Sequence, residues 1–507
     1  MTMLEPHENA LQVIYGRDAL REIEQRATLM GVDLMAQAAR SCADWLRARL
    51  PPGSRILFVA GPGNNGGDAL LSAQRLQQAG YLIDLLLPYP PQSALTRQAH
   101  AAWVATGAAT QTTLDEVTQA PQWIVDGLFG IGATRPFDAK CIALIEALNQ
   151  WGVPILALDT PSGLDPYEGS TQNVAIHAEA TLTFITHKPG LFGGRGADLA
   201  GTVYLAKLEG IDTQGLAAEG ELNLADLIEA PQLCRKRNSH KGNYGTVAIV
   251  GGAVGMLGAA LLSGRAALLS GAGKVFVAAL DTRLAVDPIQ PELMMCSATS
   301  LPQCDVLAVG PGLGCSDAAY HLLAAALAHP HALVLDADAL NLLAKDAVLR
   351  QQLVARPAPT ILTPHPAEAA RLLGVHTSDV QNRRLHAART LALSLNSVVV
   401  LKGAGSLIVE PSGYYRINTN GGPALSSAGQ GDVLTGIIAA LLAQGLTPVH
   451  AAARAVCVHA EIGDRYQARQ GGAIGLTASA SLTQIAALLN KARGLGVGDH
   501  FGRDKHE

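Results

Sequence analysis

The feature that most constrains the fold is a repeated pattern in which a short apolar run ends in glycine or polar residues and a segment with helical spacing follows. An uninterrupted apolar run is typical of a strand that is buried on both faces of a parallel sheet. Strands that alternate with helices predict an α/β fold with a parallel, doubly wound sheet. In the first half the expected strands are Ile56–Ala60, Ile83–Leu87, Trp123–Val125, Ile155–Leu158, Leu182–Ile185 and Val203–Ala206. In the second half they are Thr246–Val250, Val306–Val309, Leu333–Leu335, Thr360–Leu362 and Val398–Leu401.

The length of 507 residues is too great for one ordinary core and predicts two or three domains. The segment Lys207–Asn238 mixes charges and shows no clear strand, so we expect the domain boundary there, near residue 220. The glycine motifs of the two halves differ and no fixed period links them, which indicates a fusion of two domains, 1–220 and 221–507.

Composition excludes several classes of protein. The net charge of -5, without a long basic run, argues against a surface for nucleic acid or anionic membrane. Seven cysteines without CxxC spacing are typical of reduced thiols in a cytosolic protein. There is no apolar signal segment at the start and no uncharged apolar run of membrane-spanning length. We therefore expect a soluble, cytoplasmic protein.

The second half contains a strong candidate for an anion site in the stretch Ser426–Gly436. Its glycines, Gly429 and Gly431, precede an apolar run, Val433–Ala443, at helical spacing. Free backbone N–H groups and the positive end of a helix dipole would meet there and could hold a phosphate. Asp432 on the first turn could act as a base in phosphoryl transfer. The alternative is that the glycines only form a loop and Asp432 only caps the helix.

Polar groups also follow the other strands of the second half. They include Asp336 and Asp338, His365 and Glu368, and Lys402, which precedes Gly403. Each could be a turn, capping or solvated residue when taken alone. Their joint occurrence with Asp432 predicts a nucleotide-dependent phosphoryl-transfer site.

In the first half, polar side chains follow three strands, in the segments Asn64–Asp68, Asp126–Gly132 and Asp159–Asp165. The carboxyl ends of strands in an open α/β sheet meet at one crevice, where ligands bind. Glycines let backbone amides approach a phosphate, and Asn and Asp oxygens suit a hard cation. The alternative is that these residues only form turns and caps. No Walker A sequence is present. Gly127–Gly132 has the wrong spacing for GxGxxG and no acidic residue on the expected next strand, so it does not indicate an ordinary dinucleotide-binding Rossmann domain.

The motifs Gly61–Asp68 (GPGNNGGD), Val125–Gly132 (VDGLFGIG) and Leu158–Asp165 (LDTPSGLD) resemble the YjeF N-terminal domain, the NAD(P)HX epimerase. The resemblance implies a Rossmann-like three-layer domain that interconverts the R and S forms of hydrated NADH or NADPH at C6. It also implies a potassium ion held by Asn65, Asp126 and Ser162, and catalysis by Asp159. The hydrate would be held by Asp159 together with Asn64, Asn65, Gly66, Gly67, Asp68, Gly130, Ile131, Gly132, Ala133, Thr134 and Arg135. The segment Gln37–Arg40 departs from the family pattern and weakens any assignment on the first helices.

The second half carries, in order, GPGLG, LDADALN, TPHPAE, LKGAGS and AGQGDVLTG, and this series resembles the ribokinase-like superfamily. With SHKGNYG at the start it resembles the ADP-dependent NAD(P)HX dehydratase, the YjeF C-terminal domain. That activity would phosphorylate the S hydrate with ADP and then release phosphate, with Mg²⁺ on the nucleotide. Asp432 would be the base, and Ala253, Gly314, His365 and Asp432 would contact the hydrate. The adenine nucleotide would contact Lys402, Gly403, Ala404, Gly405, Ser406 and Gly431.

Other functions remain open at this point. One is a small-molecule kinase of vitamin or sugar type, and another is a non-catalytic binding module in the first half. Gln430 stands where many relatives of the resembled family have Thr or Ser, so its side chain is not assigned to the anion site. We further expect a homo-oligomer. Spacing alone does not distinguish ADP from ATP or NADHX from NADPHX.

Overall fold

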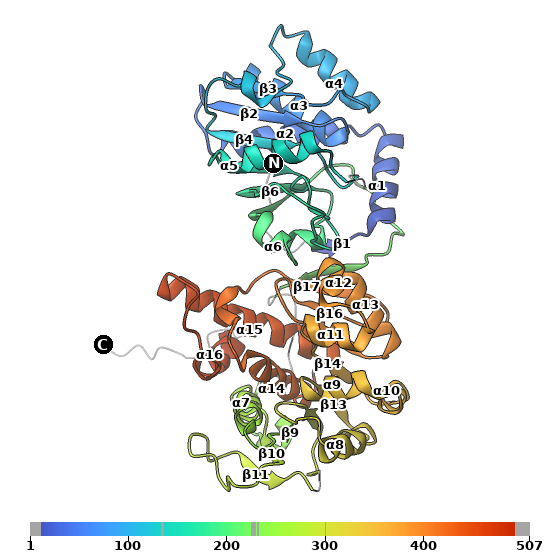
Figure 1. The fold of residues 1–507 in the computed structure, drawn as a ribbon, viewed down its shortest axis with the longest axis vertical. Helices are drawn as coiled ribbons and strands as arrows, with labels where there is room; N and C mark the ends of the chain where they lie inside the picture. Colours follow the sequence, from blue (N-terminus) through green and yellow to red (C-terminus); the bar gives the residue numbers. More distant parts are fainter. Residues whose placement is uncertain (1–11, 133–135, 225–229, 231–232, 300, 492–507) are drawn as a thin grey trace, which may run out of the picture. The chain divides into compact units, whose positions relative to one another are not determined.

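A computed structural model describes residues 12–132, 136–224, 230, 233–299 and 301–491. The chain forms two compact units (Figure 1). The first comprises Met1–Leu222 with Gln381–Arg384, and the second comprises Asn223–Val380 with Leu385–Glu507. Within the described part of the chain, no helix combines the length and the apolar character that crossing a bilayer would require.

The first unit contains a six-stranded sheet in the order β3-β2-β4-β5-β6-β7, and every pair in it is parallel. The strands are β2 Arg55–Ala60, β3 Leu82–Leu86, β4 Trp123–Gly127, β5 Ile155–Leu158, β6 Ala180–Phe184 and β7 Thr202–Ala206. The predicted parallel sheet is confirmed, and the predicted strand ends are correct to within one or two residues. The strand order reverses between β2 and β4, so the crevice at their carboxyl ends is the expected ligand position.

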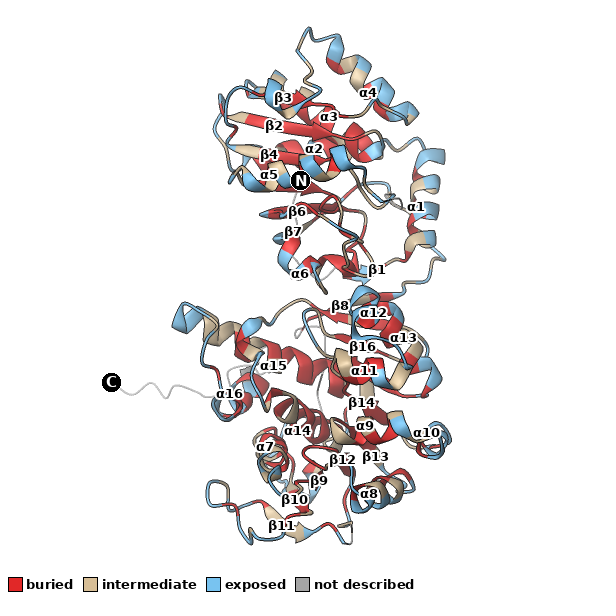
Figure 2. Cartoon of the chain, viewed as in Figure 1, coloured by how far each residue is buried: buried red, intermediate tan, exposed pale blue. Residues whose placement is uncertain are grey.

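Helices cover both faces of this sheet and make three layers, as the two separate buried clusters show. Phe58 faces one cluster with Trp45 and Trp103 from the helices, while Leu57 faces the other with Ile145. Figure 2 shows the buried strands between helices whose outer faces are exposed. The helices are α1 Arg17–Leu29, α2 Leu34–Arg47, α3 Asn64–Gln78, α4 Ala94–Val104, α5 Ala139–Gln150 and α6 Gly196–Leu199.

One expectation about the first unit is wrong. The segment Lys207–Asn238 does contain a strand, β8 (Gly220–Asn223), which pairs in antiparallel fashion with β1 (Val13–Ile14). Only four residues long, β8 alternates Glu221 and Asn223 with apolar or small residues, so it lacks the continuous apolar run that marked the other strands.

The second unit has strands in the order β17-β16-β15-β14-β13-β12-β9-β10-β11. Pairing is parallel from β11 to β15 and antiparallel through β15, β16 and β17. The strands are β9 Thr246–Gly251, β10 Lys274–Ala279, β11 Met294–Ser297, β12 Val306–Val309, β13 Ala332–Leu335, β14 Thr360–Leu362, β15 Val398–Leu401, β16 Leu407–Val409 and β17 Tyr415–Asn418. The strands β10, β11, β16 and β17 were not predicted from the sequence. Here the order reverses between β9 and β12.

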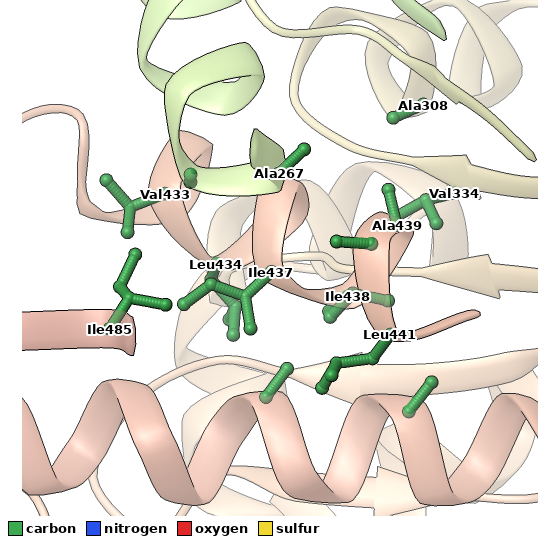
Figure 3. Close-up of a cluster of buried hydrophobic side chains, with 14 of the residues drawn as sticks. Ala267, Ala308, Val334, Val433, Leu434, Ile437, Ile438, Ala439, Leu441 and Ile485 are labelled. Atoms are coloured by element: carbon green, nitrogen blue, oxygen red, sulfur yellow. The ribbon is translucent and has the colours of Figure 1, made fainter. Parts of the chain in front are cut away.

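Helix α14 (Gln430–Ala443) lies in the core of the second unit, among side chains of neighbouring helices and strands such as Ala267, Val334 and Ile485 (Figure 3). Nearly all of its residues from Val433 onward are buried. Gly436 permits close packing on α7, because a Cβ at that position would lie 2.1 Å from the Ser263 carbonyl oxygen. The remaining helices are α7 Leu257–Leu269, α8 Asp317–Leu327, α9 Asp338–Lys345, α10 Ala347–Val354, α11 Pro366–Leu373, α12 Thr377–Asn382, α13 Arg384–Ser394, α15 Pro448–Gln470 and α16 Ala478–Lys491.

Candidate active sites

The glycines after β2 bring two predicted site loops together in the first unit. A Cβ at Gly61 would lie 1.6 Å from the Leu128 carbonyl oxygen, so only glycine allows this contact with the loop after β4. A Cβ at Gly66 would lie 1.9 Å from the Gly61 oxygen. Helix α3 then begins at Asn64 with Gly63 as its cap and without a capping side chain. The helix N-terminus at this switch point is therefore suited to an anion.

Asp126 and Ser162, which were predicted to share a cation, are in direct contact. The Ser162 backbone N–H donates to Asp126 Oδ2 at 2.8 Å, and its hydroxyl donates to Asp126 Oδ1 at 2.7 Å. Burial raises the pKa of the Asp126 carboxyl to about 6, although the bonds from Ser162 and Leu128 oppose that shift. The third predicted ligand, Asn65, is buried, and neither its Oδ1 nor its Nδ2 has a partner among the described residues. Buried amides are normally hydrogen-bonded, so an oxygen-seeking cation would complete this group.

No group of three or more His, Cys, Asp or Glu side chains in the described part of the chain is arranged to hold a metal ion. The candidate ligands at Asn65, Asp126 and Ser162 are instead an amide, a carboxylate and a hydroxyl. Such a set carries a single negative charge, which suits a weakly charged cation better than a transition metal.

Asp159 lies at the end of β5 in the left-handed region, with φ 63°. Its Oδ1 accepts a hydrogen bond from Lys188 Nζ at 2.5 Å and another from Thr183 Oγ1 at 3.2 Å. A Cβ at Gly130 would lie 3.6 Å from Asp159 Oδ2 and 3.4 Å from Asn65 Cβ. Asp159, Gly130 and Asn65 therefore surround one space, which stays open because glycine has no side chain.

Three residues of this site were not predicted: Lys188, Thr183 and Glu24. Burial raises the pKa of Glu24, and the charge of Asp159 raises it further. The pKa of Asp68, a predicted site residue, is raised well above its usual range by burial and then by Asp159 and Glu24. Like Lys402, Lys188 is a lysine shortly after a buried strand, but it lacks the adjacent glycine that singled out Lys402.

Some of the remaining predicted site residues of the first unit lie outside the described residues. Ile131 and Gly132 lie on the surface, partly or fully exposed, directly after the Gly130 turn. Ala133, Thr134 and Arg135 lie outside the described residues.

In the second unit, the Ser426–Gly436 stretch forms the predicted glycine turn and helix start. Gly429, with φ 87°, caps α14 without a side-chain hydrogen bond, and Asp432 lies in the first turn. The alternative that Asp432 caps the helix is therefore wrong. A Cβ at Gly431 would lie 3.3 Å from Lys402 Nζ, so the helix N-terminus and the lysine face the same space.

Lys402 is held by carboxylates. Its Nζ donates to Asp336 Oδ1 at 2.8 Å and lies 3.9 Å from Glu368 Oε2. Thr435 Oγ1 donates to Asp336 Oδ2 at 2.8 Å. Burial alone would lower the pKa of Lys402, but Asp336 and Glu368 outweigh it and raise that pKa. Lys402 is a charged ammonium, and its side chain is 19% exposed, so it can also reach an anion.

Asp432 has a carboxylate that receives no hydrogen bond from any described residue. Burial raises its pKa to about 7, the charge of Asp336 adds to the rise, and Lys402 opposes it. A carboxyl group with a pKa near neutrality is suited to general-base catalysis. It lies on the first turn of the helix whose free amides would hold a phosphate.

His365 and Glu368 have a structural role that the sequence left open. His365 caps α11, its Nδ1 accepting from the Ala367 N–H at 3.1 Å, while the Glu368 side chain accepts from the His365 N–H at 2.8 Å. The pKa of His365 is lowered by burial and by Lys402, so its ring is neutral at pH 7. Nδ1 is an acceptor in this capping box, and Nε2 lies 3.3 Å from Glu368 Oε1.

Ala253 and Gly314, both predicted to contact the hydrate, lie side by side at the switch point between β9 and β12. The Ala253 N–H donates to the Gly312 oxygen at 2.7 Å, and a Cβ at Gly314 would lie 3.7 Å from Ala253 Cβ. The Gly314 N–H donates to Asp338 Oδ2 at 2.8 Å. The loop Lys402–Ser406 is anchored to the next strand end, since the Lys402 N–H donates to the Pro364 oxygen, and Gly403 and Ala404 are exposed.

Gln430 points away from the anion site. Its Oε1 is 3.1 Å from His459 Nε2 and accepts from Ser481 Oγ at 3.0 Å, while its Nε2 donates to Ser427 Oγ at 3.2 Å. Its side chain is therefore a buried link between α14, α15 and α16. The donors that this turn could offer to a phosphate are therefore backbone amides, not the Gln430 side chain.

Comparison with known proteins assigns each half to a family. Residues 31–190 match the family model described as YjeF-related protein N-terminus, and residues 247–486 match the one described as NAD(P)H-hydrate dehydratase. The chain is 34% identical to the Bifunctional NAD(P)H-hydrate repair enzyme Nnr of Coxiella burnetii, over 95% of this chain and 100% of that protein. It is also 34% identical to the protein of the same name in Escherichia coli, over 90% of each. A crystal structure of the ADP/ATP-dependent NAD(P)H-hydrate dehydratase of Bacillus subtilis is 31% identical and covers 51% of this chain and 92% of that chain, with a TM-score of 0.45.

Proposed function

This chain belongs to the family of bifunctional NAD(P)H-hydrate repair enzymes, and we propose that its first unit carries the epimerase site and its second unit the dehydratase site. Matches to both halves support this division, since the residues that match the dehydratase family model lie in the second unit apart from Gln381–Arg384. The two candidate active sites described above also lie in separate units.

We propose that the second unit transfers a phosphoryl group from ADP to the C6 hydroxyl of the S hydrate. Asp432 accepts the hydroxyl proton, and the amides at the start of α14 together with Lys402 stabilise the transferring phosphoryl group. Loss of phosphate then gives NAD(P)H, with AMP as the other product. Mg²⁺ would neutralise charge on the nucleotide phosphates. Gly431 and Lys402–Ser406 would hold the nucleotide, and Ala253, Gly314 and His365 the hydrate.

One observation carries this assignment. The Asp432 carboxyl, which receives no hydrogen bond from the described residues and whose pKa is about 7, lies on the first turn of α14, which starts beside Lys402. Phosphoryl transfer to a hydroxyl needs a proton acceptor and a group of phosphate-stabilising donors at one place. This turn of the second unit supplies both.

We propose that the first unit epimerises the hydrate, with Asp159 moving a proton at the reacting centre. Asn64–Asp68 and Gly130–Arg135 would hold the dinucleotide. Potassium would bind Asn65, Asp126 and Ser162, where it would balance the Asp126 charge and satisfy the buried Asn65 oxygen. A kinase with a non-catalytic first half is less well supported, because the relatives match both halves and the polar groups of the first site are in place.

The test uses the purified full chain with R and S hydrates supplied separately, and follows the return of reduced-nicotinamide absorbance. With ADP and Mg²⁺, the S hydrate should be consumed at once and the R hydrate only after epimerisation. A phosphorylated product that persists would favour the kinase alternative. Recovery from S but never from R would contradict the epimerase assignment. The predicted homo-oligomer is tested separately by light scattering of the same sample.

The potassium assignment makes its own prediction. Replacing potassium by lithium should slow epimerisation by about tenfold, the effect of losing interactions worth roughly 1.4 kcal/mol. The rate of R-hydrate conversion, measured across matched chloride salts, checks this. Dehydration of pure S hydrate in the same salts is the control. Equal epimerisation rates in every salt would remove the cation from this site.

A further inference from the structure

Lys188 is the charged residue among the largest fully buried side chains of the first unit. Its side chain is only 2% exposed. Burying an ammonium is costly unless it is paired and hydrogen-bonded, so its place in the fold needs a reason. The residues that match the epimerase family motifs do not include it.

The ammonium of Lys188 has three oxygen partners. Nζ donates to Asp159 Oδ1 at 2.5 Å, to Thr183 Oγ1 at 2.7 Å and to the Phe184 carbonyl oxygen at 2.8 Å. An ammonium has three donors, so all of them are used. Lys188 is therefore fully engaged and is not placed to exchange protons with a substrate itself.

The same contacts make the two oxygens of Asp159 unequal. Oδ1 accepts from both Lys188 and Thr183, whereas Oδ2 faces the open position above Gly130, where a Cβ would be 3.6 Å away. Oδ2 is therefore the oxygen that a bound hydrate can reach. The bonds from Lys188 and Thr183 set this orientation, because both are made to Oδ1 and not to the oxygen that faces Gly130.

The backbone around this pair adopts unfavourable conformations at two non-glycine residues. Asp159 has φ 63° and Ile185 has φ 66°. Left-handed conformations are unfavourable for side-chain-bearing residues, most of all for a β-branched one, and they persist where surrounding contacts enforce them. The contacts around Asp159, and those around the turn after β6 that carries Lys188, therefore hold both segments in these conformations.

We propose that Lys188 is a positioning residue of the epimerase site, which fixes the Asp159 carboxylate so that Oδ2 alone takes a proton from the hydrate and returns it within one turnover. Thr183 takes part by bonding to both partners. The inference rests on the proposed epimerase function of the first unit. When Oδ2 takes the C6 hydroxyl proton, the C6–N1 bond can break to leave an aldehyde, and the proton passes to N1. Rotation about C5–C6 and closure of the C6–N1 bond on the other face reverse both proton transfers, so no further reactant is needed.

The charges around Asp159 determine what happens without Lys188. Asp159 interacts with Glu24 on α1, Asp68 on α3 and Tyr167 in the loop after β5, none of which can supply a positive charge, and Arg17 lies over the Tyr167 ring. Without the ammonium, Oδ1 would keep only the longer bond from Thr183, at 3.2 Å, and Oδ2 would no longer be held toward the position above Gly130.

The experiment compares Lys188→Met with Lys140→Met in the full chain, using pure R hydrate, ADP and Mg²⁺, with the second unit converting the product. Lys140 is an exposed lysine of the first unit that donates to the Pro88 oxygen, so it is a matched control. We expect Lys188→Met to lower kcat for R hydrate by about 100-fold with KM changed less than about threefold, as for loss of a general base. Lys140→Met should match wild type.

A double variant separates positioning from an independent role. If Lys188 acts through Asp159, Lys188→Met should add almost nothing to Asp159→Asn. Multiplied effects would overturn the proposal, as would an unchanged kcat in Lys188→Met. If circular dichroism shows that Lys188→Met does not fold, Thr183→Val replaces it in the test. We expect Thr183→Val to lower kcat for R hydrate by about tenfold. A wild-type kcat in that variant would contradict the proposal. Wild-type protein that never converts R hydrate would instead reject the epimerase assignment.

Discussion

The two units use a lysine beside a carboxylate in opposite ways. In the first unit, Lys188 bonds directly to Asp159, the proposed catalytic carboxylate, at 2.5 Å. In the second unit, Lys402 bonds to Asp336 at 2.8 Å and leaves the proposed base, Asp432, without a hydrogen bond from any described residue. The Lys188 side chain is 2% exposed and the Lys402 side chain 19%. The Lys188 ammonium therefore bonds to groups inside the protein, whereas the Lys402 ammonium is also accessible to a bound ligand.

This difference separates two kinds of proton acceptor. Burial raises the pKa of Asp432 to about 7, with Asp336 adding to the rise, so it can bind a proton near neutral pH. Asp159 instead has a full positive charge within hydrogen-bonding distance. Where the lysine bonds the catalytic carboxylate, it fixes one oxygen. Where it bonds a second carboxylate, the ammonium stays close to the helix N-terminus that could hold a phosphate, and the proposed base has both oxygens free of described hydrogen bonds.

The largest expected effect comes from removing the base of the second unit. Asp432→Asn keeps the size of the side chain but cannot accept a proton, so ADP-driven dehydration should fall by at least about 100-fold. The helix amides and Lys402 remain, so nucleotide binding should persist. Progress curves with S hydrate and calorimetric titration with ADP measure the two effects.

The matched variant is Asp159→Asn, which should leave dehydration of S hydrate intact while R hydrate remains unconverted. If Asp432→Asn abolished both activities in a folded protein, the two proton acceptors would not belong to independent sites, and the comparison of the units would fail.

Strand ends were the part of both sites that the sequence could predict. Polar residues after apolar runs predicted Asp126, Ser162 and Asp159, because the carboxyl ends of parallel strands meet at one edge. Asp432 was predicted instead from the glycine turn that precedes a helix. The structure places Asp126 and Ser162 in contact across 36 positions of sequence. It also places Lys402 beside Gly431 at the start of α14.

The pairing of charges could not be predicted. Lys188 follows β6 without a glycine turn to mark it, and nothing in its spacing pairs it with Asp159, 29 residues earlier. The pairing of Lys402 with Asp336 spans 66 residues. The direction of the Gln430 side chain depends on His459 and Ser481, which only the packing of α15 and α16 brings near. Periodicity determines which face a residue lies on, but not its partner.

The pH dependence should distinguish the two sites, with an effect of about tenfold. The folded-state pKa of Asp432 is raised, so its base form is present above pH 7 and is lost as the pH falls. At one unit below the pKa only about a tenth of a base is ionised, so kcat/KM for dehydration should fall about tenfold between pH 8 and pH 6. Epimerisation should fall less over this range.

Glu368→Gln controls for the titration of ADP itself. Glu368 is one of the charges that raise the Asp432 pKa, so its neutral isostere should move the dehydration limb to lower pH. Titration of the nucleotide would be unaffected by that change. If the acid limb of the dehydration pH profile stays at the same pH in Glu368→Gln, that limb reports titration of the nucleotide and not of Asp432.

The smallest expected effect on activity tests whether the anion site of the second unit is formed by backbone amides. Gln430→Ala leaves Ser481 and the partly buried His459, whose pKa burial and Lys402 lower to about 4, without their bonds to Oε1. We expect the free energy of unfolding to fall by about 1–3 kcal/mol, because buried polar groups lose a partner. Dehydration kcat should change less than about threefold, since the α14 amides would still hold the phosphate. Denaturant unfolding and S-hydrate kinetics measure both quantities, with the exposed Gln470→Ala at the end of α15 as the control. A loss of activity above about 100-fold with unchanged stability would show that the Gln430 side chain reaches the transferring group, as a catalytic side chain does.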